Sequence, residues 1–100
     1  MRIRWTETAT ADLEGIYDYL RENHPKLAVP VCKEIRAAIR SLRRFPRKGK
    51  PGRVKGTREL VCGQQIVVYV VEAHAIQVWR ILGAARDPEE WVRELKMMVQ

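Results

Sequence analysis

The chain has 100 residues, 46% of them hydrophobic, and a net charge of +7. This length suits one domain, so we expect residues 1–100 to fold as a single unit. The longest uncharged apolar run, Ile66–Val71, is too short to span a bilayer, and no apolar stretch follows the charged first residues, so we expect a cytoplasmic protein without a secretion signal. Cys32 and Cys62 share no metal-ligand spacing with a histidine, which predicts reduced thiols, no metal and no cofactor.

The positive charge is concentrated in one segment. Between residues 35 and 58 the chain carries ten Lys or Arg residues and no Asp or Glu, whereas the remainder has nine basic and twelve acidic residues. Such a segment attracts polyanions or an acidic protein partner. We call it the basic segment, and its charged residues are Arg36, Arg40, Arg43, Arg44, Arg47, Lys48, Lys50, Arg53, Lys55 and Arg58.

The N-terminal part predicts a strand followed by a helix. Polar and apolar residues alternate over residues 2–5, which is typical of a strand. Thr6 offers a hydroxyl that can cap a helix, and the following apolar residues recur at helical spacing. We therefore expect a helix over residues 7–22.

A second apolar stripe predicts another helix, which ends before Pro46. Its start is less clear, because Pro30 inside a helix would remove one hydrogen bond. We expect a loose turn after Pro25 and a regular helix over residues 29–44. The two helices would then form an antiparallel hairpin.

The second half of the chain predicts three strands and a helix. Residues 46–56 form a basic loop with two prolines and three glycines, where we expect no regular strand pairing. Three strand-like runs follow at Thr57–Cys62, Gln65–Glu72 and Ala75–Leu82. Asp87 and Pro88 then begin a helix over residues 88–99.

The predicted fold class is α+β. An N-terminal strand and a helical hairpin would pack on a small antiparallel meander, with a C-terminal helix. Regular alternation would place Arg58 on the face of Leu60, and Arg80 on the face of Val78 and Leu82, opposite Trp79.

Seven short phrases follow one another along nearly the whole chain: Trp5-Thr6, Tyr17-Asp18-Tyr19-Leu20, Ile39 to Phe45-Pro46, Gly49-Lys50-Pro51-Gly52-Arg53, Gly56-Thr57-Arg58-Glu59-Leu60, Ile66 to Val71, and Ile81-Leu82-Gly83-Ala84-Ala85-Arg86-Asp87. Taken together in this order, they resemble the RelE/ParE toxin superfamily, and the ParE branch more closely. The resemblance implies a sheet with a helical hairpin, and a cognate antitoxin whose acidic C-terminal segment folds onto the toxin. It also implies either DNA gyrase or ribosome-bound mRNA as the target.

Three positions favour the gyrase-directed reading. The mRNA-cleaving relatives usually carry an arginine where this chain has Ile66. Some also carry an acidic residue after the loop proline, where this chain has Gly52, and a C-terminal His-Tyr pair, where it offers only Trp91. We therefore expect a toxin that inhibits gyrase by binding, without catalysing a reaction. An mRNA endonuclease and a family member that only binds its partner are the alternatives.

The candidate residues fall into two groups. Cleavage of RNA would need cations around the charged phosphorane-like state. The arginines that could supply this charge could instead have a structural role, as partners of carboxylates or beside a helix cap. Contact with a target would fall on the end of the second helix, the basic loop and one aromatic ring. The weak catalytic candidates are Arg58, Arg80, Arg86 and Lys55; the target-contact candidates are Arg43, Arg47, Lys48, Lys50, Arg53 and Trp91.

Overall fold

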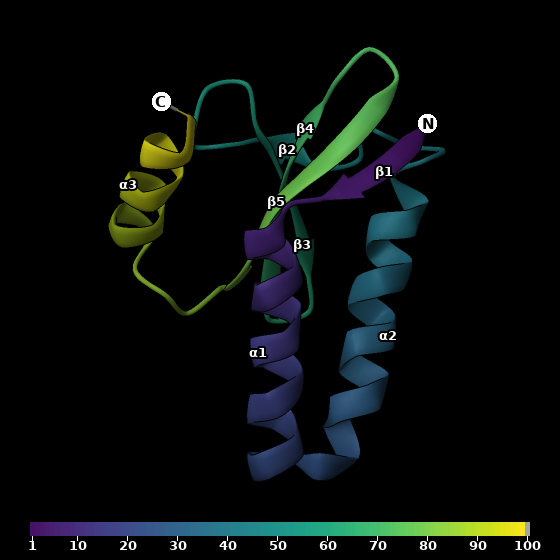
Figure 1. Ribbon diagram of the computed structural model, residues 1–100, viewed down its shortest axis with the longest axis vertical. Helices are drawn as coiled ribbons and strands as arrows, with labels where there is room; N and C mark the ends of the chain where they lie inside the picture. Colours follow the sequence, from purple (N-terminus) through teal and green to yellow (C-terminus); the bar gives the residue numbers. More distant parts are fainter. Residues whose placement is uncertain (100) are drawn as a thin grey trace.

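A computed structural model describes residues 1–99 and confirms the α+β class (Figure 1). Two long helices stand side by side against one face of a five-stranded sheet, whose order is β1-β5-β4-β3-β2. None of the helices in residues 1–99 combines the length and apolarity needed to cross a membrane. The elements are β1 (Arg2–Trp5), α1 (Glu7–Asn23), α2 (Pro25–Ser41), β2 (Lys50–Pro51), β3 (Arg58–Cys62), β4 (Gln65–Val71), β5 (Ala75–Gly83) and α3 (Pro88–Val99).

The sheet differs from a pure antiparallel meander at both of its edges. The strands β3, β4 and β5 are antiparallel, as expected, but β1 lies parallel to β5, with Ile3 opposite Ile76. At the other edge, the loop that was expected to lack strand pairing forms the short strand β2, where Lys50 pairs with Glu59. The parallel pair is compatible with its connection, because the hairpin and three strands lie between β1 and β5, and parallel strands require a long crossover.

The first helix forms as expected because Thr6 caps it. The Thr6 hydroxyl accepts a hydrogen bond from the Ala9 amide at 3.0 Å and donates one to the Trp79 carbonyl at 3.0 Å. The cap therefore ends β1, begins α1 and ties this corner to β5.

The expected start of the second helix was wrong, since α2 begins at Pro25 and continues through Pro30. Pro25 suits the first helical position, where its missing amide costs nothing. Pro30 deprives only the carbonyl of Lys26 of a helical partner, and both residues are exposed, so water can bind that carbonyl.

A β-bulge in β5 corrects the predicted alternation. Val68 lies opposite Arg80 whereas Tyr69 lies opposite Val78, so Trp79 is an extra residue in the pairing. Beyond the bulge the faces exchange, and Ile81 packs towards the hairpin together with Val78. Arg80 therefore does not share a face with Val78.

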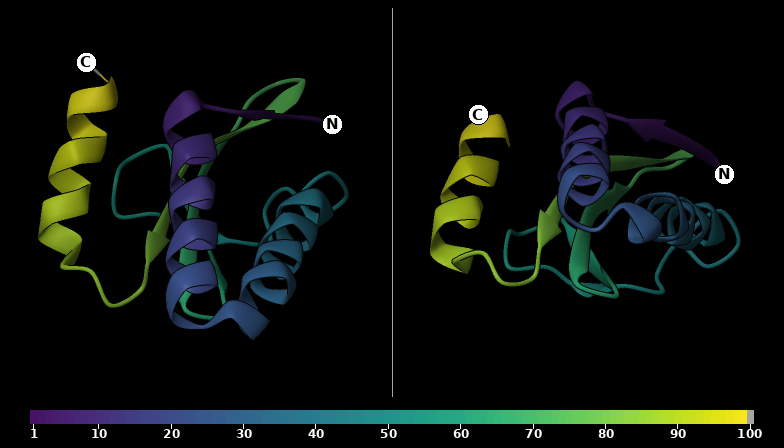
Figure 2. Two further views of the ribbon diagram at one scale, coloured as in Figure 1. Left: turned by 60° about the horizontal axis from the view of Figure 1, so that its bottom comes forward. Right: turned by 90° about the horizontal axis from the view of Figure 1, so that it is seen from below.

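Both faces of the sheet are covered. The larger core lies between the sheet and the hairpin, and the smaller one lies beneath α3, which stands apart from the hairpin in both views of Figure 2. The smaller core includes Val54 from the basic loop, which therefore packs on the α3 side. The buried residues of this smaller core are Val54, Ile66, Val68, Leu82, Trp91 and Leu95.

Candidate functional site

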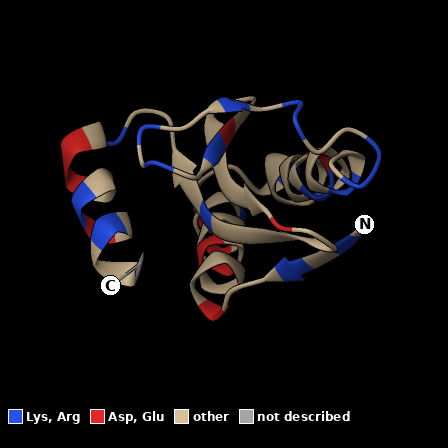
Figure 3. Cartoon of the chain, turned by 90° about the horizontal axis from the view of Figure 1, so that it is seen from above, with Lys and Arg blue, Asp and Glu red and all other residues tan. Residues whose placement is uncertain are grey.

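The basic segment runs along the second half of α2, through the loop and into β3. Figure 3 shows Lys and Arg along this path and on β1, whereas Asp and Glu gather on α1 and at the start of α3. Among the ten cations of the segment, Arg53 alone forms an ion pair with a carboxylate of the described residues. Five target-contact candidates are exposed, namely Arg43, Arg47, Lys48, Lys50 and Arg53.

The basic loop is held by a buried hydroxyl. Tyr69 on β4 is fully buried, and its hydroxyl donates to the Pro46 carbonyl at 2.8 Å while accepting from the Gly49 amide at 2.9 Å. A Cβ atom on Gly49 would come within 2.8 Å of that hydroxyl, so only glycine fits the close approach. The sheet therefore sets the position of the loop backbone.

Arg58, a catalytic candidate, also serves the loop. Its Nε atom donates to the Gly49 carbonyl at 3.0 Å and its Nη2 atom to the Arg47 carbonyl at 3.3 Å. The guanidinium thus satisfies loop carbonyls, and the loop presents its cations from a braced backbone. Neither Glu59 nor Glu72, the carboxylates suggested as partners from the sequence, pairs with Arg58.

Arg53 braces the end of the loop against the sheet. Its amide donates to Glu59 at 2.8 Å and its guanidinium forms an ion pair with the same carboxylate, which is 2% exposed. The guanidinium also lies 5.1 Å from the ring centroid of Trp91. Trp91 itself is 1% exposed, so its ring packs in the smaller core and offers no surface to a partner.

The catalytic candidate Arg80 joins three elements. Its guanidinium donates to Asp12 of α1 at 2.8 and 3.2 Å and to Glu94 of α3 at 2.9 Å. Asp12 also accepts from the Ile81 amide at 2.9 Å, on the edge of β5 that β1 leaves unpaired. Arg80 is 9% exposed, so this network connects the hairpin, the sheet and α3 within the protein.

The catalytic candidate Arg86 belongs to the same network. Its guanidinium contacts Glu90 at 3.2 Å and Glu94 at 3.3 Å. Hydrogen bonds from Arg80, together with the charge of Arg86, lower the pKa of Glu94, and the bond to Asp12 raises the pKa of Arg80. The sequence suggested that Arg86 forms an ion pair with Asp87 at the start of a helix. An ion pair is present, but its partners are Glu90 and Glu94.

The four catalytic candidates do not gather around one point. Arg80 and Arg86 meet at Glu94, whereas Arg58 and the exposed Lys55 lie in or beside the basic loop. The distant partners Asp12 and Glu94 escaped sequence reasoning, because only the fold brings them to Arg80. Within residues 1–99, no three His, Cys, Asp or Glu side chains lie close enough together to hold a metal ion.

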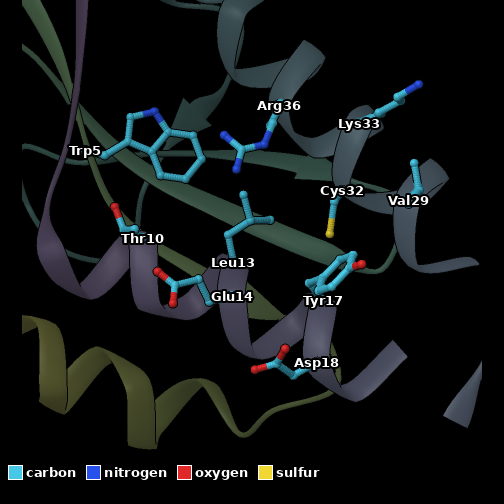
Figure 4. Close-up of a pocket in the computed structure, with 10 residues that line it drawn as sticks. All are labelled: Trp5, Thr10, Leu13, Glu14, Tyr17, Asp18, Val29, Cys32, Lys33 and Arg36. Carbon is cyan, nitrogen blue, oxygen red and sulfur yellow. The ribbon is translucent and has the colours of Figure 1, made fainter. Parts of the chain in front are cut away.

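A groove of about 620 Å³ runs between α1 and α2 on the outer side of the hairpin (Figure 4). Leu13, Tyr17 and Cys32 contribute its apolar floor, and Figure 4 shows the Cys32 sulfur pointing towards the Tyr17 ring. One rim is acidic, with Glu14 and Asp18 from α1, and the other is basic, with Lys33 and Arg36 from α2. An apolar floor between charged rims is a shape that accepts an amphipathic helix.

This arrangement of a helical hairpin on a five-stranded sheet is that of the RelE/ParE toxin superfamily. Residues 3–88 match the model of the family described as the ParE toxin of the type II toxin–antitoxin system parDE. The chain belongs to this ParE toxin family.

Related proteins agree with this assignment. The chain is 33% identical over 94 residues to a Sinorhizobium fredii protein named "Putative toxin Y4kP", covering 94% of this chain and 96% of the relative. It is 28% identical over 85 residues to toxin RelE2 of Caulobacter vibrioides, covering 85% of this chain and 97% of that toxin. Among solved structures, the chromosomal ParDE system of P. aeruginosa superposes with a TM-score of 0.77 at 28% identity, covering 83% of this chain and 95% of that one.

Proposed function

We propose that this toxin acts by binding and inhibiting DNA gyrase in the cytoplasm, without a chemical step of its own. The single observation that carries the proposal is the basic segment, whose exposed cations rest on a loop braced by Tyr69 and Arg58. A rigid surface loses little conformational entropy on binding, and a field of one sign accelerates the encounter with an anionic partner. The similarity to the ParDE structure supports the ParE branch, for which the resemblance of the sequence implies gyrase as the target.

The arginines that could serve RNA cleavage are engaged within the protein. Arg80 and Arg86 are bound to carboxylates, and Arg58 is bound to loop carbonyls. A phosphate would have to displace these partners before an arginine could stabilise a transition state. The position that carries an arginine in mRNA-cleaving relatives is Ile66, which packs in the core beneath α3.

The alternative function is ribosome-dependent cleavage of mRNA, which the RelE-like side of the resemblance implies. In that case Arg58, Arg80, Arg86 and Lys55 would supply the positive charge, and the network around Glu94 would have to open. A family member that binds its antitoxin without harming the cell is the third possibility.

Induction of the chain in cells that lack its antitoxin separates these functions. Inhibition of gyrase predicts filamentous cells and a DNA-damage response while mRNA stays intact. Cuts at codon-level positions in mRNA within minutes of induction would contradict the proposal and support the endonuclease. Normal growth with folded protein present would support the binding-only function.

The partner we propose is an antitoxin of roughly 60–100 residues encoded beside this chain, with a DNA-binding N-terminal half. Its acidic C-terminal segment would lie against the basic segment, and its apolar side would enter the groove between α1 and α2. Co-expression with the neighbouring gene should yield a complex that weakens as salt concentration rises. Recovery of free toxin alone would contradict the partner, and a complex indifferent to salt would contradict the electrostatic contact.

A further inference from the structure

A cationic groove lies between β1 and α2, where three arginines of the basic segment face one arginine of β1. A groove of about 350 Å³ opens there, with Arg2 on the β1 side and Arg36, Arg40 and Arg43 on the α2 side. Its remaining lining residues are Ile3, Trp5 and Ile39, so the lining includes no carboxylate. Four guanidinium groups therefore surround one hollow without an acidic residue among them.

These arginines have no carboxylate partners in the described part of the chain. The ion pairs among residues 1–98 involve other arginines, namely Arg21, Arg53, Arg80 and Arg86. Like charges held close together repel each other, and the repulsion acts against the compact state. An anionic ligand removes this repulsion, because it supplies the opposite charge in the groove.

One hydrogen bond joins the two sides of the groove. Arg43, in the turn that follows α2, donates from Nε to the Met1 carbonyl at 3.2 Å, next to the start of β1. Arg36 and Arg40 lie one turn apart on α2, with Cβ atoms about 5–6 Å from each other, and Arg43 continues this row in the turn after α2. Successive phosphates of one DNA strand are farther apart than the axial rise of about 3.4 Å, because the strand also winds around the axis, so neighbouring arginines of the row suit neighbouring phosphates.

The groove offers charge and no free aromatic face. The Arg36 guanidinium lies 5.7 Å from the ring centroid of Trp5, so it covers the ring that could otherwise stack on a base; Figure 4 shows the two side chains next to each other. A single strand gains its affinity partly from such stacking, whereas a duplex presents phosphates at regular spacing without further ordering. The ligand that suits this groove is the backbone of a duplex.

We propose that the groove between β1 and α2 binds the phosphate backbone of duplex DNA, independently of base sequence. Arg36, Arg40 and Arg43 contact successive phosphates of one strand, and Arg2 contacts the same strand from the opposite wall. Guanidinium groups suit this role because they bind phosphate oxygens in pairs. This binding does not depend on gyrase being the target.

The test measures binding of the purified chain to a fluorescent duplex of about 20 base pairs over a range of salt concentrations. Each phosphate contact contributes about 0.9 to the slope of log affinity against log salt. The variant Arg36→Gln/Arg40→Gln should lower that slope by about 2 and weaken binding about tenfold or more at 0.1 M salt. Arg40→Gln alone should show about half the loss of slope, which guards against a fold defect in the double variant.

The matched control is Arg93→Gln/Lys96→Gln, which removes the same charge from exposed positions of α3. The control should change the slope of log affinity against log salt by much less than the value of about 0.9 for one phosphate contact, because these residues lie outside the groove. Equal losses in both double variants would overturn the proposal and leave only a diffuse attraction. Tighter binding of a single strand, or equal competition by polyglutamate, would also overturn it, because the groove would then favour another polyanion.

Discussion

The hydroxyl of Tyr69 shows how one buried atom can shape a charged surface. It bridges Pro46 and Gly49, and the side chain of Arg58 binds the loop from the other side. Gly49 is buried, so its amide depends on the Tyr69 hydroxyl for a hydrogen bond.

Tyr69→Phe should therefore lower the free energy of unfolding by about 1–3 kcal/mol, because a buried amide and a carbonyl lose their partner. It should also let trypsin cut faster after Arg47 and Lys48. Urea unfolding and timed digestion measure the two effects. Tyr19→Phe, at a position that is 60% exposed, should change neither. Unaltered stability and digestion of the Tyr69 variant would show that the loop is held by other contacts.

Substitution of Arg80 can distinguish a structural role of this residue from a catalytic one. Arg80→Met should reduce the free energy of unfolding by about 3 kcal/mol, because it leaves Asp12 without its partner at a largely buried site. Chemical denaturation checks this, with Arg93→Met at an exposed position of α3 as the control. A variant of full stability that has lost toxicity would contradict the structural role and favour RNA cleavage.

At the scale of elements, the carboxylate of Glu94 fastens α3 to the rest of the protein. Contacts with Arg80 and Arg86 lower the pKa of Glu94 below its ordinary value of 4.5. A carboxylate with a lowered pKa stabilises the fold fully above its unfolded pKa, and the contribution is lost as pH falls through the folded pKa.

The stability difference between the wild type and Glu94→Gln should therefore be constant from neutral pH down to about pH 5, and should shrink at lower pH. Denaturant unfolding at several pH values measures this difference, and Glu89→Gln, an exposed change on the same helix, serves as the control. A difference that persists unchanged at pH 2–3 would mean that the charge of Glu94 does not fasten α3.

Elements with strong local signals could be predicted from the sequence. The helices α1 and α3 follow from a capping residue and a regular apolar stripe. The predicted start of α2 was wrong because the helix tolerates Pro30: the exposed Lys26 carbonyl can do without the hydrogen bond that a residue-30 amide would otherwise donate. The bulge at Trp79 was missed, although the adjacent apolar residues Val78 and Trp79 interrupt the alternation there, because such an interruption also occurs in a strand that is covered on both faces.

The candidate site was only partly predictable, because local sequence patterns do not reveal contacts between distant residues. The basic segment is a run in the sequence, so it is visible without a structure. The partners of Arg80 are 68 and 14 residues away, and no local pattern indicates them. The groove between β1 and α2 joins Arg2 to Arg36 and Arg40, which only the fold brings together.

At the scale of the whole molecule, charge is distributed so that one side attracts anions while the acidic residues gather on α1 and α3 (Figure 3). Reversal of Arg43, Arg47 and Lys50 to Glu should abolish or strongly reduce toxicity while the fold persists. Exposed charges contribute well under ~1 kcal/mol each to stability, whereas their combined field acts on the target.

A thermal melt and a growth assay of this triple variant measure the two effects together. The matched control reverses Lys26, Arg93 and Lys96, which are exposed outside the basic segment. An unfolded variant would show that these residues support the fold. A folded variant that still kills at full potency would move the target contact away from the basic loop.

The most direct measurement of the central claim uses purified gyrase and a relaxed plasmid. The protein should inhibit supercoiling in proportion to the gyrase it occupies, the antitoxin should restore activity, and the triple charge reversal should fail to inhibit. Full gyrase activity at saturating toxin, together with cleavage of mRNA in a translation extract, would contradict inhibition by binding and assign the protein to RNA cleavage.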